Sequence, residues 1–419
     1  MIYRNVTEVL LSALQDSPVV FLSGARQTGK STLARWLTGT HYPARYITLD
    51  DATVLAAAQA DPTGFIVGLE GPVVLDEVQR VPELFLAIKA AVDRDRRPGQ
   101  FLLTGSADVL LLPRLSEFLV GRMEIITLWP FSQGELDGVV EGFVDTVFAD
   151  DFSPVSTQEN RSMDLIERVV TGGYPEAVAR SDPDRRRAWF NSYVTTLLRR
   201  DVRDLANIEH LDALPRLLSL LAARATSLLN YAELSRSLGL PQTTLKRYLT
   251  LLKTTFLVQF LPAWSANLGK RLVKSPKLLL IDAGLMIHLL GIDSQALRSR
   301  PELLGPVLEN FVAMELKKQI TWSRVQPGIY HFRTGTGQEV DIVLEDASGR
   351  VVGIEVKASA TVRSQDFKGL RYLADLLGDR FLRGIVLYTG DQHVPFGTNL
   401  HALPISSLWE LNARPQPKH

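Results

Sequence analysis

A glycine-rich segment near the N-terminus has the residue types and spacing of a phosphate-binding loop. Residues 24–31 read GARQTGKS and fit the pattern G-x-x-x-x-G-K-[ST] without a mismatch. Glycines let the backbone wrap around a phosphate and direct N–H groups at it, and the start of a helix adds favourable partial charge. Lys30 would then reach the β- and γ-phosphates, and the Ser31 hydroxyl would ligate Mg²⁺. A glycine turn with an incidental lysine is the alternative.

An apolar segment that ends in two acids follows downstream, where Val73–Leu75 leads into Asp76 and Glu77. Asp76 at a strand end would hold the Mg²⁺ shell, and Glu77 would polarise an attacking water. A strand that merely ends in a charged turn is the alternative. The residues expected to contact ATP are Gly24, Ala25, Arg26, Gln27, Thr28, Gly29, Lys30, Ser31, Thr32 and Asp76, of which Ser31 and Asp76 would bind its Mg²⁺.

Two further positions carry candidate catalytic side chains. An apolar segment ends in Thr104, with Ser106 close behind, and a hydroxyl there could contact the γ-phosphate or orient the water. Arg122 precedes another predicted strand and could act across a subunit interface on a neighbour's γ-phosphate. A small-residue turn and a solvated arginine are the respective alternatives.

Two neighbouring predicted strands in the C-terminal part carry carboxylates and a lysine. Strand alternation places Glu355 and Lys357 on one face, and Asp341 can face the same site across the hairpin. Asp341 and Glu355 could share a divalent metal, while Lys357 could orient or help deprotonate a water and stabilise charge on the reacting phosphate. Glu309, on a predicted helix, fits an additional acidic position. The pattern resembles the active site of restriction-endonuclease-like nucleases.

Three interpretations of this C-terminal pattern stay open. It is a structural hairpin with alternating charges, a nuclease-like fold that binds without cutting, or an active nuclease. The motif is short, and a charged β-hairpin is common, so the pattern does not choose among them.

A helical segment in the middle of the chain has the layout of a winged helix. Asn230 can cap a helix over residues 231–238, with Glu233 completing a capping box and Gly239 ending the helix. Pro241 opens a second helix, whose apolar face leaves its polar N-terminal half for a DNA groove. A protein–protein module is the alternative. The residues expected to contact DNA are Gln242, Thr243, Lys246, Arg247, Lys270, Arg271 and Lys274.

Secondary-structure signals place these residues on an alternating α/β framework. The N-terminal strands are expected at 19–23, 45–49, 72–75, 100–104 and 125–128, with helices at 31–37, 51–59 and 81–92. Such alternation predicts a parallel sheet with helices on both faces. Later strands are expected at 256–261, 277–281, 328–332, 339–344, 351–357 and 383–388.

The fold class is therefore α/β: a P-loop NTPase parallel sheet, then a helical winged-helix module, then an α/β restriction-endonuclease-like domain. The expected divisions are an ATPase domain at 1–140, a linker or surface insertion at 141–161, a helical connector at 162–225, a winged helix at 226–295, an endonuclease-like domain at 296–412 and a frayed, disordered tail at 413–419.

Taken together, the motifs resemble a family of AAA+ ATPases in bacteria and archaea that joins an ATPase domain to a winged helix and a restriction-endonuclease-like domain of unknown function. The resemblance covers essentially the whole chain, and one departure is that the second sensor arginine of many AAA+ proteins has no clear match. Besides residues 24–31, the motifs that carry this resemblance are Leu75–Gln79, Leu103–Ser106, Leu119–Arg122, Pro130–Ser132, Gly172–Glu176 and Arg200–Val202.

The composition fits such a protein and excludes several classes. Forty-six basic residues balance 46 acidic ones, so a generally basic nucleic-acid coat is excluded and any DNA contact must come from local patches. Cysteine is absent, which excludes disulfides and thiolate chemistry, and the seven histidines lack ligand spacing. Neither a signal peptide nor a membrane span is apparent, so we expect a cytoplasmic protein.

Three functions remain open from the sequence. The leading one is an ATP- and Mg²⁺-dependent AAA+ ATPase that binds and remodels DNA, including branched DNA, as a homo-oligomer such as a hexamer or partial ring. An ATP-dependent metal nuclease in defence or repair is the second. A nucleotide-gated regulator that binds protein is the third. Oligomerisation is implied by the AAA+ resemblance and by Arg122 as a group acting in trans.

Overall fold

The computed structural model describes residues 1–106, 121–152, 164–205, 213–266 and 274–417. The chain forms two compact units. Residues 4–130 and 249–257 form the first, called here the N-terminal unit, and residues 1–3, 131–248 and 258–419 form the second, the C-terminal unit.

The N-terminal unit contains a five-stranded, wholly parallel sheet with the order β2-β3-β4-β1-β5. Its strands are β1 (Val19–Ser23), β2 (Arg45–Thr48), β3 (Val73–Asp76), β4 (Phe101–Gly105) and β5 (Met123–Thr127). All five predicted strands are confirmed within two or three residues. In this order β1 lies next to β4, and β4 lies next to β3. Because the strands are parallel, the loop after β1 lies at the same edge of the sheet as the carboxyl ends of β4 and β3.

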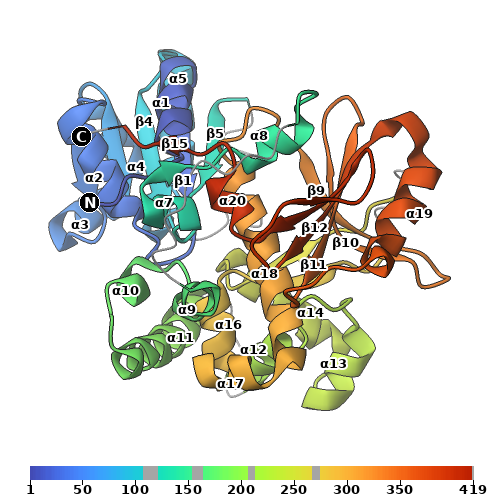
Figure 1. The fold of residues 1–419 in the computed structure, drawn as a ribbon. Helices are drawn as coiled ribbons and strands as arrows, with labels where there is room; N and C mark the ends of the chain where they lie inside the picture. The colour runs from blue at the N-terminus through green and yellow to red at the C-terminus, as the bar shows by residue number, and fades with distance from the viewer. Residues whose placement is uncertain (107–120, 153–163, 206–212, 267–273, 418–419) are drawn as a thin grey trace. The chain divides into compact units, whose positions relative to one another are not determined.

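Helices cover both faces of this sheet because alternate strand residues point to opposite sides. Phe21 packs in one core together with α3 (Ala52–Ala60), α4 (Pro62–Val67) and α5 (Leu84–Arg94). Leu22 packs in the other core, together with α1 (Thr7–Asp16) and α2 (Lys30–Thr40). The short turn η1 (Val78–Arg80) follows β3. The two-faced α/β layer expected for a P-loop NTPase fold is therefore present (Figure 1).

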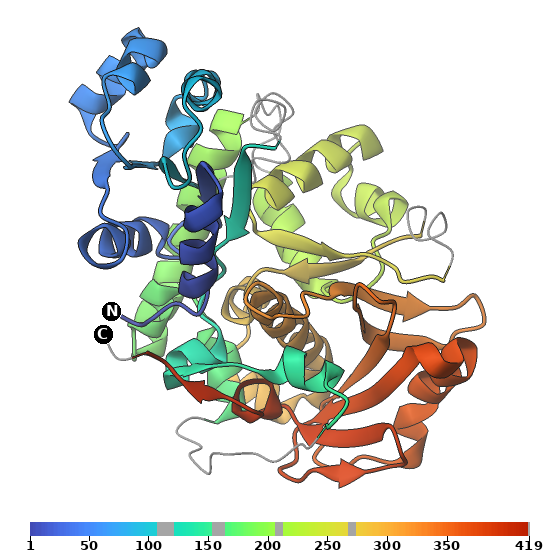
Figure 2. The ribbon, with the colours of Figure 1, turned by 90° about the horizontal axis from the view of Figure 1, so that it is seen from above.

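The C-terminal unit contains a mixed six-stranded sheet with the order β13-β14-β12-β11-β10-β9. Figure 1 shows α18 and α19 on opposite sides of it, and Figure 2 shows the same strands, coloured orange to red, from above. Its elements are α18 (Pro301–Ile320), β9 (Gly328–Arg333), β10 (Glu339–Glu345), β11 (Val351–Lys357), η3 (Ser364–Phe367), α19 (Lys368–Leu377), η4 (Gly378–Arg380), β12 (Phe381–Tyr388), β13 (Val394–Pro395) and β14 (Leu400–Pro404).

Mostly helical segments precede this sheet, and a two-stranded antiparallel hairpin of β7 and β8 follows α14. These elements are α7 (Gln133–Asp137), β6 (Val139–Val140), α8 (Phe143–Phe148), α9 (Leu165–Thr171), α10 (Pro175–Val178), α11 (Pro183–Leu205), α12 (Ala213–Ala223), α13 (Tyr231–Leu238), α14 (Gln242–Thr254), β7 (Val258–Leu261), β8 (Lys277–Leu280), α16 (Ala283–Leu290) and α17 (Ser294–Ser299).

Two expectations about irregular segments are wrong where the structure describes them. Residues 143–148 form α8, whose Phe143 and Phe148 are buried, so this part of the expected linker belongs to a packed core. Residues 153–161 lie outside the described residues. The expected frayed tail includes β15 (Arg414–Pro415), which pairs with β6, and α20 (Ser407–Glu410) precedes it. Neither segment has a periodic sequence pattern, and each packs against residues far away in the chain. Local sequence patterns therefore did not predict α8 or the pairing of β15 with β6.

In the described part of the chain, no helix combines the length and apolarity that a membrane crossing requires.

Candidate functional site

The glycine-rich loop joins the inner strand β1 to helix α2. Gly29 has φ 96° and Gly24 has φ 156°, and a Cβ on Gly24 would lie 2.3 Å from the carbonyl oxygen of Leu128. These two glycines are therefore required by backbone conformation and by close approach. The Thr28 hydroxyl donates to the carbonyl oxygen of Ala25 at 2.9 Å and closes the loop. Arg26, Gln27 and Thr32 lie on the loop or the first turn of α2, as expected.

Lys30 lies at the start of α2 with its side chain turned back into this loop. Its exposed fraction is 4%, and Nζ donates to the carbonyl oxygens of Gly24 and Ala25 at 3.0 and 2.8 Å. Both partners are neutral, so the buried ammonium has no compensating carboxylate among these two bonds. A phosphate group would offer it a stronger, charge-assisted bond. The loop, the helix N-terminus and Lys30 therefore fit the triphosphate of a nucleotide.

Asp76 ends β3 at the centre of a group of hydroxyls. The Ser31 hydroxyl donates to Oδ1 at 2.8 Å, and the Thr104 hydroxyl donates to the same oxygen at 2.5 Å. The Tyr46 hydroxyl donates to Oδ2 at 2.7 Å. The structure thus brings together Ser31 and Asp76, the pair expected to hold Mg²⁺, and their oxygens are the ligands that Mg²⁺ prefers.

Glu77 follows Asp76 in a left-handed backbone conformation, with φ 60°. Its backbone N–H donates to the Thr104 hydroxyl at 3.1 Å. Its carboxylate accepts a hydrogen bond from the Gln79 amide, whose Nε2 also donates to the Ser106 hydroxyl at 3.0 Å. A left-handed non-glycine residue is strained, and such strain concentrates at functional sites. Thr104 and Ser106, the two expected hydroxyls, therefore both reach the Glu77 region, one through the backbone and one through Gln79.

Three side chains of this site were missed from the sequence. Gln79 contacts Glu77, Tyr46 contacts Asp76, and the buried Arg4 donates to the carbonyl oxygen of Thr28 at 2.8 Å. Burial, followed by the hydrogen bond to Asp76, raises the pKa of Tyr46 to about 12, so its hydroxyl stays a donor at neutral pH. Only Gln79 had a sequence signal, because it lies beside the acidic pair.

Arg122 lies just before β5 and pairs within its own unit. Its Nε donates to Asp93 Oδ1 at 2.5 Å, and this bond lowers the pKa of the Asp93 carboxyl. The arginine side chain is 29% exposed. The geometry therefore gives it a local partner, and a role in trans stays a prediction.

The candidate recognition helix α14 has the two faces expected of it. Leu245, Tyr248, Leu249 and Leu252 are buried. Gln242, Thr243, Lys246 and Arg247 are exposed. Lys274 lies in the loop between β7 and β8 and is exposed, whereas Lys270 and Arg271 lie outside the described residues.

Helix α13 begins and ends largely as expected. The Asn230 side chain accepts from the Glu233 backbone N–H, and Gly239 ends the helix with φ 66°. The Glu233 carboxylate pairs with Arg224 at 2.6 Å, so its place in the capping box is taken by an ion pair. The helix–helix–hairpin order is consistent with a winged helix, and that assignment stays a prediction.

The C-terminal carboxylates meet at β10 and β11, where Ile342 pairs with Ile354 and sets the register. Asp341 Oδ2 accepts from the Val356 backbone N–H at 2.9 Å. Lys357 Nζ donates to Glu355 Oε2 at 2.9 Å. Burial, followed by the neighbouring Asp341, raises the pKa of Glu355 well above its usual range. The three residues predicted from the hairpin are therefore neighbours in the structure.

Lys277, at the start of β8, points into the same carboxylate group. Its side chain is 3% exposed, and Nζ lies 2.7 Å from Glu309, 2.9 Å from Glu339 and 3.5 Å from Asp341. Burial alone would lower the pKa of Lys277, but the three carboxylates outweigh it and hold the pKa above its ordinary value. Glu309 is thus beside Asp341, as expected, but it bonds to a lysine. Among the described residues, no three histidine, aspartate or glutamate side chains are arranged to hold a metal ion.

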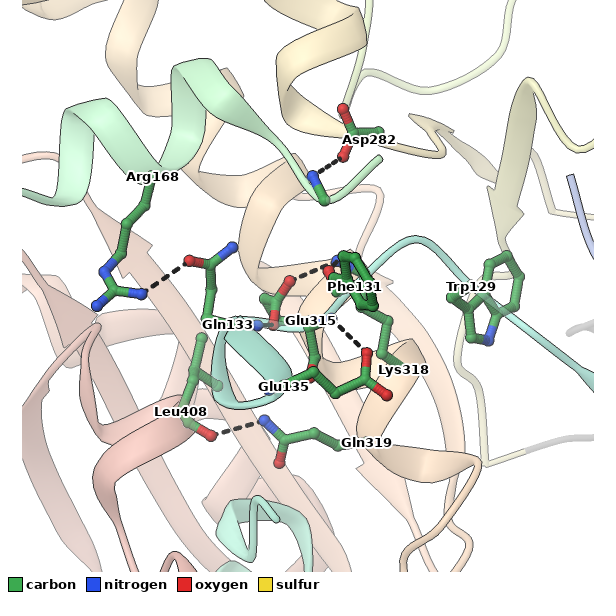
Figure 3. A network of polar contacts seen from close by, with 12 residues as sticks. Trp129, Phe131, Gln133, Glu135, Arg168, Asp282, Glu315, Lys318, Gln319 and Leu408 are labelled. Carbon is green, nitrogen blue, oxygen red and sulfur yellow. Dashed lines mark hydrogen bonds and ion pairs between the residues drawn. The ribbon is translucent and has the colours of Figure 1, made fainter. Parts of the chain in front are cut away.

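A buried polar network surrounds the Pro130–Ser132 motif (Figure 3). Ser132 caps α7 in a capping box with Glu135. Glu315 of α18 accepts from the Gln133 backbone N–H at 2.9 Å, and Lys318 donates to the carbonyl oxygen of Phe131 at 2.8 Å. The segment Pro130–Ser132 therefore leads into a helix whose first turn is anchored to α18.

The Gly172–Glu176 motif contacts the same network. Gly172 has φ 69°, and the Gly173 backbone N–H donates to the buried Asp282 at 2.7 Å. The Phe131 backbone N–H donates to the carbonyl oxygen of Gly173 at 2.7 Å. A Cβ on Gly173 would lie 2.2 Å from the carbonyl oxygen of Phe131, so a side chain cannot fit there. The glycine at position 173 is therefore required for packing of the C-terminal unit.

Comparison with known proteins agrees with the loop chemistry. A family model described as an AAA domain matches residues 16–137. Two domains of unknown function, DUF8612 and DUF4143, match residues 162–296 and 304–408. The AAA match indicates a P-loop ATPase, and the other two matches leave the winged-helix and nuclease-like assignments open.

Two curated mycobacterial proteins are similar over almost the whole chain. They are Uncharacterized protein Rv2008c of Mycobacterium tuberculosis and Uncharacterized protein Mb2031c of Mycobacterium bovis. Each is 34% identical over 408 residues, which cover 97% of this chain and 84% of the relative. The chain, which carries an AAA domain followed by two domains of unknown function, therefore belongs to the same family as these two proteins.

Proposed function

We propose that this protein is a Mg²⁺-dependent ATPase of the AAA+ class that binds DNA and acts on it as an oligomer. The observation that carries the ATPase part is the convergence of Lys30, Ser31, Asp76 and Glu77 at the carboxyl ends of β1 and β3. Loop, helix start and paired acids are the parts that phosphoryl transfer to water requires.

Each side chain has a distinct task in this proposal. Lys30 exchanges its two carbonyl partners for phosphate oxygens, which keeps its buried charge compensated. Ser31 and Asp76 would hold a Mg²⁺ ion, which would neutralise phosphate charge. Glu77 accepts a proton from the attacking water. Thr104 fixes the backbone position of Glu77 and also donates to Asp76.

DNA binding is supported by the exposed N-terminal half of α14. Gln242, Thr243, Lys246 and Arg247 are exposed there, while the opposite face of the helix is buried. A helix with one buried face and one exposed polar face can present polar side chains to a DNA groove and basic side chains to DNA phosphates. Because the net charge is zero, contact must be local and should weaken with salt.

Oligomerisation is the remaining part of the proposal. It is supported by the AAA domain and by the partial exposure of Arg122. In this arrangement Arg122 leaves Asp93 and contacts the γ-phosphate bound by a neighbouring subunit, in a hexamer or partial ring.

An ATPase assay with single-stranded, duplex and four-way-junction DNA tests the proposal. Wild type should hydrolyse ATP, and one of the DNA forms should stimulate turnover. Lys30→Ala should lose ATP binding. Sedimentation with ATP should show an assembly, and a monomer alone would remove the oligomer from the proposal. No turnover under any condition would contradict the ATPase assignment.

A metal nuclease is the second candidate, because the structure brings Asp341, Glu355 and Lys357 together. It predicts Mg²⁺- or Mn²⁺-dependent DNA cleavage that Lys357→Ala abolishes while ATP hydrolysis continues.

A further inference from the structure

We propose that Lys277 is the resident cation of the C-terminal carboxylate site and excludes a divalent metal ion from it. The C-terminal domain then lacks the metal ion that DNA cleavage would require. This inference does not depend on the ATPase assignment, because it concerns a different unit of the chain and its test uses nucleotide-free protein.

The position of the ammonium group supports this proposal. Nζ of Lys277 lies 2.7 Å from Glu309 and 2.9 Å from Glu339, which are the lengths of strong charge-assisted hydrogen bonds. It lies 3.5 Å from Asp341, the residue whose other oxygen is held by the backbone of β11. A dication bound by Glu309 and Asp341 would need the space between these carboxylates, and the ammonium group occupies it.

The charge balance supports the same conclusion. The carboxylates of Glu309, Glu339, Asp341 and Glu355 face the cations of Lys277, Lys357 and Arg333. Even with all four carboxylates ionised, the three cations leave at most one negative charge. A divalent cation prefers several ionised carboxylates, so the site lacks the charge that would bind one.

Lys277 is also fixed in its place. It begins β8, where it pairs with Leu261 of β7, and its side chain is 3% exposed. Removing it would leave buried carboxylates without their counter-ion, which is strongly unfavourable. A metal ion that displaced the ammonium would leave the buried Lys277 without its carboxylates, which is also unfavourable. A variant that lacks the ammonium should accept the ion.

The experiment is an Mn²⁺ titration of the full chain without nucleotide, with free Mn²⁺ measured by electron paramagnetic resonance. Four proteins are compared: wild type, Asp341→Asn, Lys277→Met, and the double variant Lys277→Met/Asp341→Asn. Subtracting the Asp341→Asn titration from its parent removes any Mn²⁺ held at Ser31 and Asp76. Lys277→Arg serves as the matched control that keeps the charge.

Wild type and Lys277→Arg should show no Asp341-dependent Mn²⁺ binding. Lys277→Met should gain one Mn²⁺ site that the double variant Lys277→Met/Asp341→Asn lacks. Mn²⁺ should also raise the Tm of Lys277→Met by several °C and leave that of wild type unchanged, because an ion that binds only the folded state stabilises it.

Either of two results would overturn the proposal. One is an Mn²⁺ site in wild type that Asp341→Asn removes. The other is a folded Lys277→Met variant, verified by circular dichroism, that gains no site. If Lys277→Met does not fold, the comparison of wild type with Asp341→Asn still decides, since the proposal requires the two to titrate alike.

Discussion

Two buried lysines distinguish the two units of this protein. Lys30 in the N-terminal unit donates to two carbonyl oxygens of its own loop. Lys277 in the C-terminal unit donates to Glu309 and Glu339 and lies beside Asp341. The first ammonium has neutral partners in these bonds, and an anionic ligand would improve them. The second is already compensated by carboxylates.

This difference bears on which ions each site can accept: a phosphate beside Lys30, and no divalent metal ion beside Lys277. A buried ammonium that donates to carbonyl oxygens gains a stronger, charge-assisted bond when a phosphate takes their place. A buried charge within a carboxylate cluster is held by that cluster, and removing either side costs free energy. The residue type alone is therefore uninformative, and the charge of its partners decides what it can do.

The largest expected effect comes from Glu77→Gln, which tests whether the N-terminal site hydrolyses ATP. The amide cannot accept the proton of the attacking water, so kcat for ATP hydrolysis should fall by a factor of about 10²–10⁴. ATP affinity should stay near that of wild type, as measured by fluorescence titration. Glu83→Gln, at an exposed glutamate nearby, is the control and should leave kcat unchanged. Hydrolysis at the parent rate would show that Glu77 is not the base.

Lys277→Met tests the ion cluster of the C-terminal unit. Removing one partner of a buried ion cluster should lower the free energy of unfolding by about 3–5 kcal/mol, as measured by urea denaturation. Lys274→Met changes an exposed lysine of the same segment and should cost less than about 0.5 kcal/mol. Equal effects of the two variants would show that the cluster contributes no more than a surface charge.

Glu141 extends the comparison to a buried group with acidic neighbours. Burial, followed by the charge of Glu135, raises its pKa to about 8. Between its ordinary pKa and about 8 the folded chain therefore holds a proton that the unfolded chain has lost, so the free energy of unfolding falls as pH rises through this window. Glu141→Gln should remove this dependence and, above pH 8, stabilise the protein by an amount on the order of 1 kcal/mol or more.

The measurement for Glu141 is urea denaturation at pH 5 and pH 8.5. Wild type minus Glu141→Gln isolates this one group from the other buried acids. Glu302→Gln, at an exposed position of α18, should show no such difference. A pH-independent difference for Glu141→Gln would mean that its pKa is unshifted.

Gln79→Leu is expected to have a smaller effect on the ATP site. The amide donates to the Glu77 carboxylate and to Ser106, so its loss should misplace the base and lower kcat about tenfold with KM unchanged. Gln79→Asn, which keeps the amide, should recover part of the rate. Gln59→Leu, on an exposed position of α3, is the control. A change in KM alone would show that Gln79 contributes to nucleotide binding and not to positioning Glu77.

The smallest effect is expected from single basic residues of α14. Lys246→Ala and Arg247→Ala should each reduce the slope of log Kd for DNA against log salt by about one. Fluorescence anisotropy at several salt concentrations measures this slope. Arg236→Ala, at an exposed arginine of α13, is the control. Unchanged slopes in both variants would place the DNA contact elsewhere.

Local patterns predicted the N-terminal unit well. The loop, the acidic pair and all five strands follow from residues that are close together in sequence. Arg4 was missed because its contact with the loop joins positions far apart in the chain, and no local pattern marks it.

The C-terminal site was predicted in part. Alternation along β10 and β11 placed Asp341, Glu355 and Lys357 together, because strand geometry fixes which residues share a face. Lys277 was missed because it stands at the edge of an apolar strand that pairs with β7, and its carboxylate partners come from α18 and β10. Only the tertiary structure shows that this lysine is internal.

One reaction tests the central claim most directly. Wild type is incubated with ATP, Mg²⁺ or Mn²⁺, and four-way-junction, duplex or single-stranded DNA, and both phosphate release and DNA integrity are measured. The account predicts phosphate release that Glu77→Gln abolishes, with the DNA uncut. DNA cleavage that Lys357→Ala removes, or the absence of phosphate release, would contradict it.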